Sequence, residues 1–163
     1  MEAVSEVGHR QFVLFRLGTE EYGLPIERVQ SIIRYEVPTP VPHSPDFVEG
    51  VINLRGQVIP VLDLALRLLG TPLERSVYSR IVVAESDSGL VGLAVDSANE
   101  VATIALDAIM EAPASALTAE TAEAFQGVAN YGERLVILLD PDKALPKVTY
   151  GVAIATEEAQ GDV

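Results

Sequence analysis

A hairpin motif that occurs twice in the chain limits the folds open to it. Residues 50–63 read GVINLRGQVIPVLD, which predicts a short strand, a tight turn at Arg55-Gly56 and a second, almost wholly apolar strand. Gly56 can adopt the positive φ that such a turn requires. An offset of 77 residues aligns this stretch without a gap to residues 127–140, matching Gly, Val, Asn, the apolar run and the closing Asp. The sequence therefore predicts two related hairpins.

A second pair of segments repeats upstream of these hairpins. Residues 12–15 align with residues 81–84, and residues 22–26 align with residues 91–95, both at an offset of 69. The later offset of 77 requires a net insertion of eight residues, which the Ala-rich and Ser-rich stretch 112–124 accommodates. Chance similarity between apolar strands is the alternative. The gapless Gly, Asn and Asp positions favour two related β modules in one compact unit.

The rest of the chain also indicates many short strands with glycine-marked turns. We expect strands over residues 11–17, 21–26, 30–36, 51–54, 58–63, 78–85, 90–95, 99–106, 127–131 and 134–140. Short helices are expected as one turn from Pro25, over 44–50, over 63–70 and near 118–125. No long helices alternate with the strands, so we predict an all-β fold of small barrels or a sandwich rather than a Rossmann-type sheet.

Composition excludes several classes of function. The 163 residues contain no Cys and two His, so we expect no disulfide, no thiol catalysis, no metal site and no cofactor. No apolar run reaches about 18 residues and no signal region opens the chain, which predicts no direct membrane insertion and a cytoplasmic location. The net charge of −13 argues against nucleic acid as a partner. The first half is nevertheless the better candidate for meeting an acidic partner, because it carries Arg16, Arg28, Arg34, Arg55 and Arg67.

One pair of carboxylates leaves an enzymatic alternative open. Asp63 and Asp140 are equivalent under the repeat, as are the two catalytic carboxylates of a two-lobed aspartic protease. Such chemistry needs each Asp on a small, glycine-containing turn, whereas Leu64 and Pro141 follow here. We favour roles at strand ends or as helix caps for both residues. A small hydrolase that uses Asp63 and Asp140 remains the alternative.

The chain resembles the CheW family of bacterial chemotaxis coupling proteins. The resemblance covers about residues 11–146 and is most specific in the Asn-Leu-Arg-Gly run with its Pro-Val-Leu-Asp-Leu continuation. The segments that carry it are 12–15, 21–26, 29–32, 47–56, 58–64, 92–96 and 135–140.

The resemblance implies two SH3-like five-stranded β barrels packed around a shared core, with short helices. It makes residues 11–147 one CheW-like domain that divides near residues 70–80, allows strands to be exchanged between the barrels, and leaves 1–10 and 148–163 as tails. It further implies a non-enzymatic adaptor. One surface would bind the CheW-like regulatory domain of a CheA-type histidine kinase, and a groove between the barrels would bind the helical tip of a methyl-accepting chemotaxis receptor.

The same resemblance implies which residues meet partners. Arg55 matches an arginine implicated in coupling, while Val29 and Ile32 match apolar contact positions. Asn53 and Gly56 belong to the motif that displays Arg55, and we include them in the candidate partner-binding set. Self-association in the rings of a signalling array is a further expectation.

Two features leave the exact role open. Ser31 stands where some relatives carry an acidic residue, so the kinase contact is expected to differ in detail. No receiver domain follows, which disfavours a CheW–receiver fusion. A CheW-like competitor, or an adaptor in a non-flagellar chemosensory pathway, is the alternative within the same family.

Overall fold

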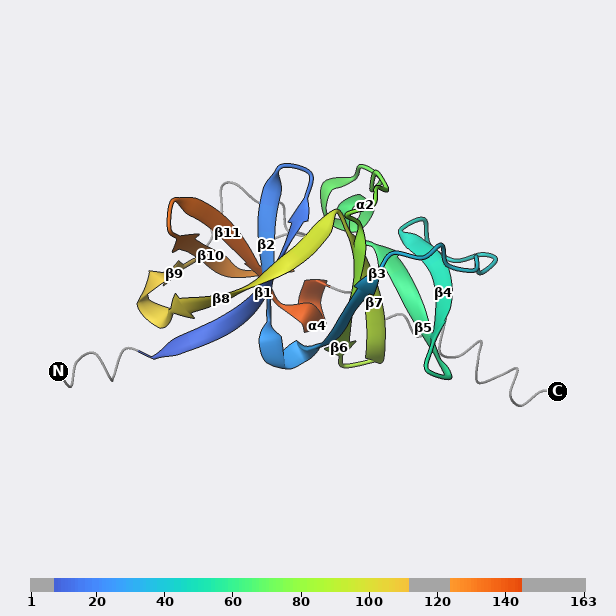
Figure 1. Cartoon of the computed structure of the whole chain (residues 1–163), viewed down its shortest axis with the longest axis horizontal. Coiled ribbons are helices and arrows are strands. Elements are labelled where there is room, and N and C mark those ends of the chain that lie inside the picture. Colours follow the sequence, from blue (N-terminus) through green and yellow to red (C-terminus); the bar gives the residue numbers. More distant parts are fainter. Residues whose placement is uncertain (1–7, 112–123, 145–163) are drawn as a thin grey trace.

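The computed structural model describes residues 8–111 and 124–144, which form two barrel-like lobes side by side (Figure 1). The elements in chain order are β1 (His9–Leu17), β2 (Glu20–Pro25), η1 (Ile26–Arg28), β3 (Val29–Arg34), β4 (Val48–Leu54), β5 (Gln57–Asp63), α2 (Leu64–Leu69), β6 (Arg80–Ser86), β7 (Gly89–Val95), β8 (Ser97–Ala105), η2 (Leu106–Ala108), β9 (Ile109–Met110), β10 (Phe125–Tyr131), β11 (Arg134–Leu139) and α4 (Pro141–Ala144). The prediction of a mainly β fold with short helices is confirmed.

The strands form two sheets, and each sheet takes strands from both halves of the chain. The six-stranded barrel has the order β8-β1-β2-β11-β10-β9, and the five-stranded barrel has the order β3-β6-β7-β5-β4. In each barrel a parallel pair joins two antiparallel hairpins: β2 pairs with β11 in one, and β7 pairs with β5 in the other. The N-terminal hairpin therefore completes a barrel whose remaining strands follow residue 96.

The predicted repeat reappears in the register of these pairs. Val61 pairs with Gly92 in the five-stranded barrel, and Leu138 pairs with Gly23 in the six-stranded barrel. Both pairs obey the offsets of 77 and 69 seen in the sequence. The prediction of two related β modules is thus confirmed, and the modules interlock rather than stand apart.

Alternation along the strands explains why they are apolar on both faces. In β1, Phe12 and Leu14 fill the core of the six-stranded barrel, while Phe15 and Leu17 point into a core shared by the two barrels. The ring of Phe15 stacks on that of Tyr22 at 5.9 Å, and burial raises the pKa of Tyr22 to about 12. In β6 the same alternation divides its residues between the core of the five-stranded barrel and the shared core. Strands buried on both faces read as continuous apolar runs.

Two glycines of the repeat allow a short segment to lie across each hairpin. Gly50 has a φ of 147°, and a Cβ there would overlap the carbonyl oxygen of Thr39, which bridges to Val51. At the equivalent Gly127, a Cβ would lie 2.8 Å from the carbonyl oxygen of Met110 in β9. The crossing segment counts as a strand only at β9, which is why one barrel has six strands and the other five.

Local signals were misleading in two places. The helix expected over residues 44–50 is wrong: Ser44 donates to the carbonyl of Val41, the chain turns, and β4 begins at Val48. Pairing of β4 with β5 outweighs the capping signal because it buries a whole strand face. β1 begins at His9, before the expected start at residue 11. The helical turn expected near 118–125 and both expected tails lie largely outside the described residues.

Candidate functional site

Arg55 lies at the tip of the β4–β5 hairpin in a strained conformation. Arg55 has a φ of 55° and Gly56 a φ of 85°, the pattern of a type I′ turn. The Asn53 side chain closes the turn, since its Oδ1 accepts a hydrogen bond of 2.9 Å from the N–H of Gly56. A left-handed conformation costs a non-glycine residue about 1 kcal/mol, and the repeat has Gly132 at the position of Arg55. The tight hairpin therefore directs an exposed guanidinium into solvent.

An open groove of about 340 Å³ lies along the outer side of this hairpin. It is lined by Glu36, Val37, Thr39, Val51, Ile52, Asn53 and Val58. Val58 pairs with Asn53 across the hairpin and is 56% exposed, while Val37 is 71% exposed. We call Val37, Val51, Asn53, Arg55 and Val58 the β4–β5 face. A partly apolar groove, lined also by Glu36 and lying along a hairpin that ends in the exposed Arg55, is suited to binding another protein.

Val29 and Ile32 lie elsewhere, on strand β3. β3 and β4 are the two edge strands of the five-stranded barrel and do not pair with each other. Val29 and Ile32 therefore do not lie beside the Arg55 hairpin in the sheet. Val29 is half-buried and packs against the shared core. Ile32 pairs with Val82 and is 38% exposed, so it sits at the rim of the shared core rather than inside it. The predicted partner-binding residues therefore fall on two surfaces.

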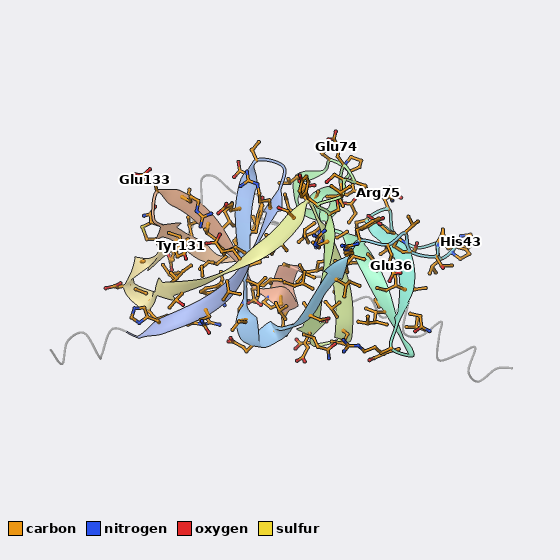
Figure 2. The ribbon with its side chains drawn as sticks, in the orientation of Figure 1. Glu36, His43, Glu74, Arg75, Tyr131 and Glu133 are labelled. Carbon is orange, nitrogen blue, oxygen red and sulfur yellow. The ribbon has the colours of Figure 1, made fainter. Side chains whose placement is uncertain are left out.

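The six-stranded barrel carries a counterpart of the β4–β5 face. Leu135 pairs with Asn130, as Val58 pairs with Asn53, and Leu135 is 57% exposed. Met110, paired with Val128, is 49% exposed beside them. We call Met110, Val128, Asn130, Glu133 and Leu135 the β10–β11 face. Glu133 lies at the outer end of this barrel (Figure 2), and the two hairpins occupy opposite ends of the long axis of the molecule (Figure 1).

A half-buried polar cluster supports the loop between α2 and β6. The hydroxyl of Tyr35 donates to Oε1 of Glu49 at 2.5 Å, and Arg75 reaches the same oxygen at 3.6 Å. The Arg75 guanidinium also lies 5.1 Å from the centre of the Tyr35 ring. Burial raises the pKa of Glu49, and burial together with the Glu49 carboxylate raises the pKa of Tyr35. The cluster fixes Arg75, which Figure 2 places beside Glu74 on this loop.

The two repeat-related aspartates serve as helix caps. Asp63 is buried and accepts hydrogen bonds from the N–H groups of Leu66 and Leu73, one on each carboxylate oxygen. Asp140 accepts from the N–H of Asp142 at the start of α4. The preference for capping roles is confirmed, and among the hydrogen bonds of the described residues none joins Asp63 to Asp140. Both carboxylate oxygens of Asp63 are taken up by backbone N–H groups, so the described hydrogen bonds give no support to the hydrolase alternative.

Two further findings concern the part of the chain that the structure describes. No group of three or more His, Asp or Glu side chains is arranged to hold a metal ion there. Nor does that part contain a helix with the length and apolar character needed to cross a membrane.

Comparison with known proteins decides the family. The model of the CheW-like domain matches residues 11–148, which is most of the chain. The chain belongs to the CheW family of chemotaxis coupling adaptors. It is 35% identical to the chemotaxis protein CheW of Klebsiella aerogenes over 136 residues, covering 83% of this chain and 81% of that protein. It is 36% identical to the CheW of Rhizobium meliloti over 139 residues, covering 85% and 89%.

A solved structure agrees with this result. The crystal structure of the scaffolding protein TtCheW from Thermoanaerobacter tengcongensis superposes with a TM-score of 0.77 at 32% identity. The match covers 84% of this chain and 92% of that one. The expected pair of SH3-like barrels is confirmed by this likeness and by the two sheets described above.

Local sequence patterns do not reveal the exposed apolar residues Val37 and Val58, which line the groove along the β4–β5 hairpin of this CheW-family fold. Val58 borders the turn as the second residue of β5, but the run that follows it is almost wholly apolar, so no alternation marks Val58 as an exposed position. The signal for Val58 was its pairing position opposite Asn53, which depends on the turn type. Val37 carries no local signal because its place beside β4 comes from the bridge between Thr39 and Val51.

Proposed function

We propose that this chain couples the helical signalling tip of a chemoreceptor to the regulatory domain of a CheA-type histidine kinase. The role is positional and takes place in the cytoplasm, with no reaction catalysed by the chain itself. Family membership supports the coupling role. The observation that carries the proposal is the rigid display of Arg55 at the tip of the hairpin whose Asn53 and Val58 line the groove.

The hairpin suits Arg55 to anchor a partner. Both central turn residues have positive φ, and the side chain of Asn53 closes the turn, so the backbone beneath Arg55 is fixed before binding. A preorganised anchor loses little conformational entropy when it meets its partner. Arginine beside apolar side chains is also typical of the residues that dominate the energy of protein interfaces. Asn53 and Gly56 contribute to binding by holding this geometry.

The arrangement of the two barrels suits an adaptor with more than one partner. The β4–β5 face and the β10–β11 face lie at opposite ends of the molecule (Figure 1). If each of these faces bound one CheW-like domain, the chain would form one link in a row or ring of such domains. The bound domain could be that of the kinase or that of a second copy of this chain. The rim of the shared core, where Val29 and Ile32 lie, is then left for the receptor helix.

Calorimetric titration against the regulatory domain of the CheA-type kinase from the same genome tests the kinase contact. We expect saturable one-to-one binding that Arg55→Glu weakens at least about tenfold, because charge reversal at an interface anchor removes attraction and adds repulsion. Lys143→Glu on α4 is the matched control, since it makes the same change in net charge outside the β4–β5 hairpin, and exposed Lys143 takes part in none of the ion pairs of the described residues. Equal affinities of wild type and a folded Arg55→Glu variant would remove Arg55 from the interface.

A second titration tests the receptor contact. A fragment of the receptor signalling tip is the probe, and Ile32→Ser is the variant, because Ile32 is partly exposed and its replacement leaves the barrel cores intact. We expect Ile32→Ser to lower the affinity for the receptor fragment and to leave the affinity for the kinase domain unchanged. Wild-type protein that is folded and binds neither probe would contradict the proposed function.

A further inference from the structure

Two arginines lie side by side on the neighbouring strands β3 and β6, at the rim of the shared core. Arg34, the last residue of β3, pairs directly with Arg80, the first residue of β6. Their neighbours along the two strands, Ile32 and Val82, also pair, and Val82 points into the shared core. Because side chains alternate along a strand, Arg34 and Arg80 lie on the same side of the sheet as Ile32. The partly exposed Ile32 is thus bordered by two cations.

The described residues do not neutralise this pair. No carboxylate oxygen of residues 8–111 and 124–144 lies within 4.0 Å of the Arg34 or Arg80 side chains, whereas six other arginine–carboxylate contacts occur there. The chain as a whole has 24 acidic and 11 basic residues, so two neighbouring arginines without a carboxylate partner among the described residues are unexpected. Like charges in directly opposed cross-strand positions destabilise a sheet.

The turn before β6 holds the second arginine in place. The guanidinium of Arg80 donates from Nη1 to the carbonyls of Val77 and Ser79, at 3.0 and 2.8 Å. The N–H of Tyr35 donates to the carbonyl of Ser79, which ties this turn to the end of β3. The turn displays Val77 and Tyr78, which are 82% and 68% exposed. Exposed apolar side chains on a rigid turn beside fixed charges are typical of a binding surface.

We propose that Ile32, Arg34, Val77, Tyr78 and Arg80, here named the Arg34–Arg80 face, determine specificity for the receptor. The inference rests on the proposed function. The occupant is an amphipathic helix of the receptor tip that carries a carboxylate next to its apolar stripe. Its apolar side chains cover Ile32 and the turn, and its carboxylate lies between the two guanidinium groups and relieves their repulsion.

Spacing favours a helix in this position. Ile32 and Arg34 are two residues apart on a strand, which separates them by about 6.6 Å along its axis. Residues four apart on a helix are separated by about 6 Å and share one face. One apolar and one acidic side chain in an i, i+4 arrangement therefore match the apolar and basic positions of β3.

Charge variants of the full-length chain test the inference, with binding to the receptor-tip fragment measured by calorimetry at about 50 and 300 mM salt. Arg34→Gln is expected to weaken binding about fivefold to tenfold at low salt and to reduce its salt dependence. The matched control is Lys143→Gln on α4, which removes one exposed cation that takes part in none of the ion pairs of the described residues, and it is expected to leave the affinity within about twofold.

Charge reversal separates binding from folding. Arg34→Glu puts a carboxylate opposite Arg80, so we expect the melting temperature to rise by about 1–3 °C while the receptor affinity falls more than about tenfold. Arg34→Lys keeps the charge and is expected to retain most of the affinity. A loss of binding in a variant that is more stable than wild type cannot come from misfolding.

Each outcome decides between the two proposals. Receptor binding that is the same for wild type, Arg34→Gln and Arg34→Glu would overturn the inference and leave the proposed function standing. An effect of these variants on the kinase regulatory domain alone would assign the face to the other partner and overturn the inference as well. Wild-type protein that binds neither probe would overturn the proposed function and the inference with it.

Discussion

The hydroxyl of Tyr35 donates a hydrogen bond of 2.5 Å to Oε1 of Glu49, within reach of the Arg75 guanidinium. Removal of the donor would leave the half-buried carboxylate short of a partner, so we expect Tyr35→Phe to lower the free energy of unfolding by about 1–3 kcal/mol. Urea denaturation at neutral pH measures this change. Tyr78→Phe, whose ring is exposed, is the control and is expected to change stability by less than about 0.5 kcal/mol.

The same contact predicts a pH dependence of stability. Burial raises the pKa of Glu49, so the folded state holds this proton more tightly than the unfolded state does. The contribution of Glu49 to stability is therefore full below its unfolded pKa and is lost as the pH rises through the raised folded pKa. Glu49→Gln keeps an acceptor for Tyr35 without this titration. We expect the stability of Glu49→Gln relative to wild type to be greater at pH 7 than at pH 4, as measured by thermal unfolding; a difference independent of pH would contradict this assignment.

The crossing of the β4–β5 hairpin by Thr39 predicts a strict need for glycine at residue 50. A Cβ at Gly50 would overlap the carbonyl oxygen of Thr39, and the φ of 147° is unfavourable for any other residue. We expect Gly50→Ala to lower the free energy of unfolding, measured by urea denaturation, by about 3 kcal/mol or more, because the backbone of Thr39 must move to make room for the new Cβ. Gly18 has a φ of 64°, and a Cβ added there would meet no other atom. Gly18→Ala is therefore the control, and we expect it to lower the free energy of unfolding by only about 1 kcal/mol in the same denaturation experiment. Equal losses for the two variants would contradict the close approach.

The strain at the hairpin tip predicts that stability and binding oppose each other at Arg55. Replacement by Gly removes the penalty for a φ of 55°, so Arg55→Gly is expected to raise the free energy of unfolding by about 0.5–1 kcal/mol. Arg55→Val, which is β-branched, is expected to lower it. Chemical denaturation of the two variants checks the signs. A destabilised Arg55→Gly variant would mean that the Arg55 side chain makes a contact of its own with the fold.

An ion pair between η1 and α4 predicts a loss of stability in acid. Arg28 donates to both carboxylate oxygens of Asp142, at 3.3 and 2.6 Å, and lowers the pKa of that carboxyl. The stabilisation is therefore present above the unfolded pKa of Asp142 and is lost as the pH falls through its lowered folded value. Because the Asp142 side chain is 31% exposed, we expect Asp142→Asn to cost only about 1 kcal/mol at pH 7. In urea denaturation the cost should become smaller as the pH is lowered from 7 to 3, and a cost that stays the same over this range would point to packing instead.

Local sequence patterns predicted the strands well because burial on both faces makes them continuous apolar runs. The Asp63 cap and the Gly70 end of α2 were equally readable, since both signals act within one helical turn. The helix expected over 44–50 failed because a capping signal is local, whereas the pairing of Val48 with Leu62 joins residues 14 positions apart. In the candidate site too, local features could be predicted from the sequence and features that depend on distant pairing could not. The Arg55 turn was readable, but its apolar neighbours Val37 and Val58 were not.

The sequence by itself determined that the chain consists of two related β modules with a charged turn at Arg55, because apolar periodicity and glycine positions act over a few residues. It also carried the resemblance to the CheW family. Only the tertiary structure decided that each barrel combines strands from both halves, and that Arg34 meets Arg80 at the rim of the shared core. Those relationships come from pairing between distant strands, and the free energy that selects them is gained only when both barrels close over one core.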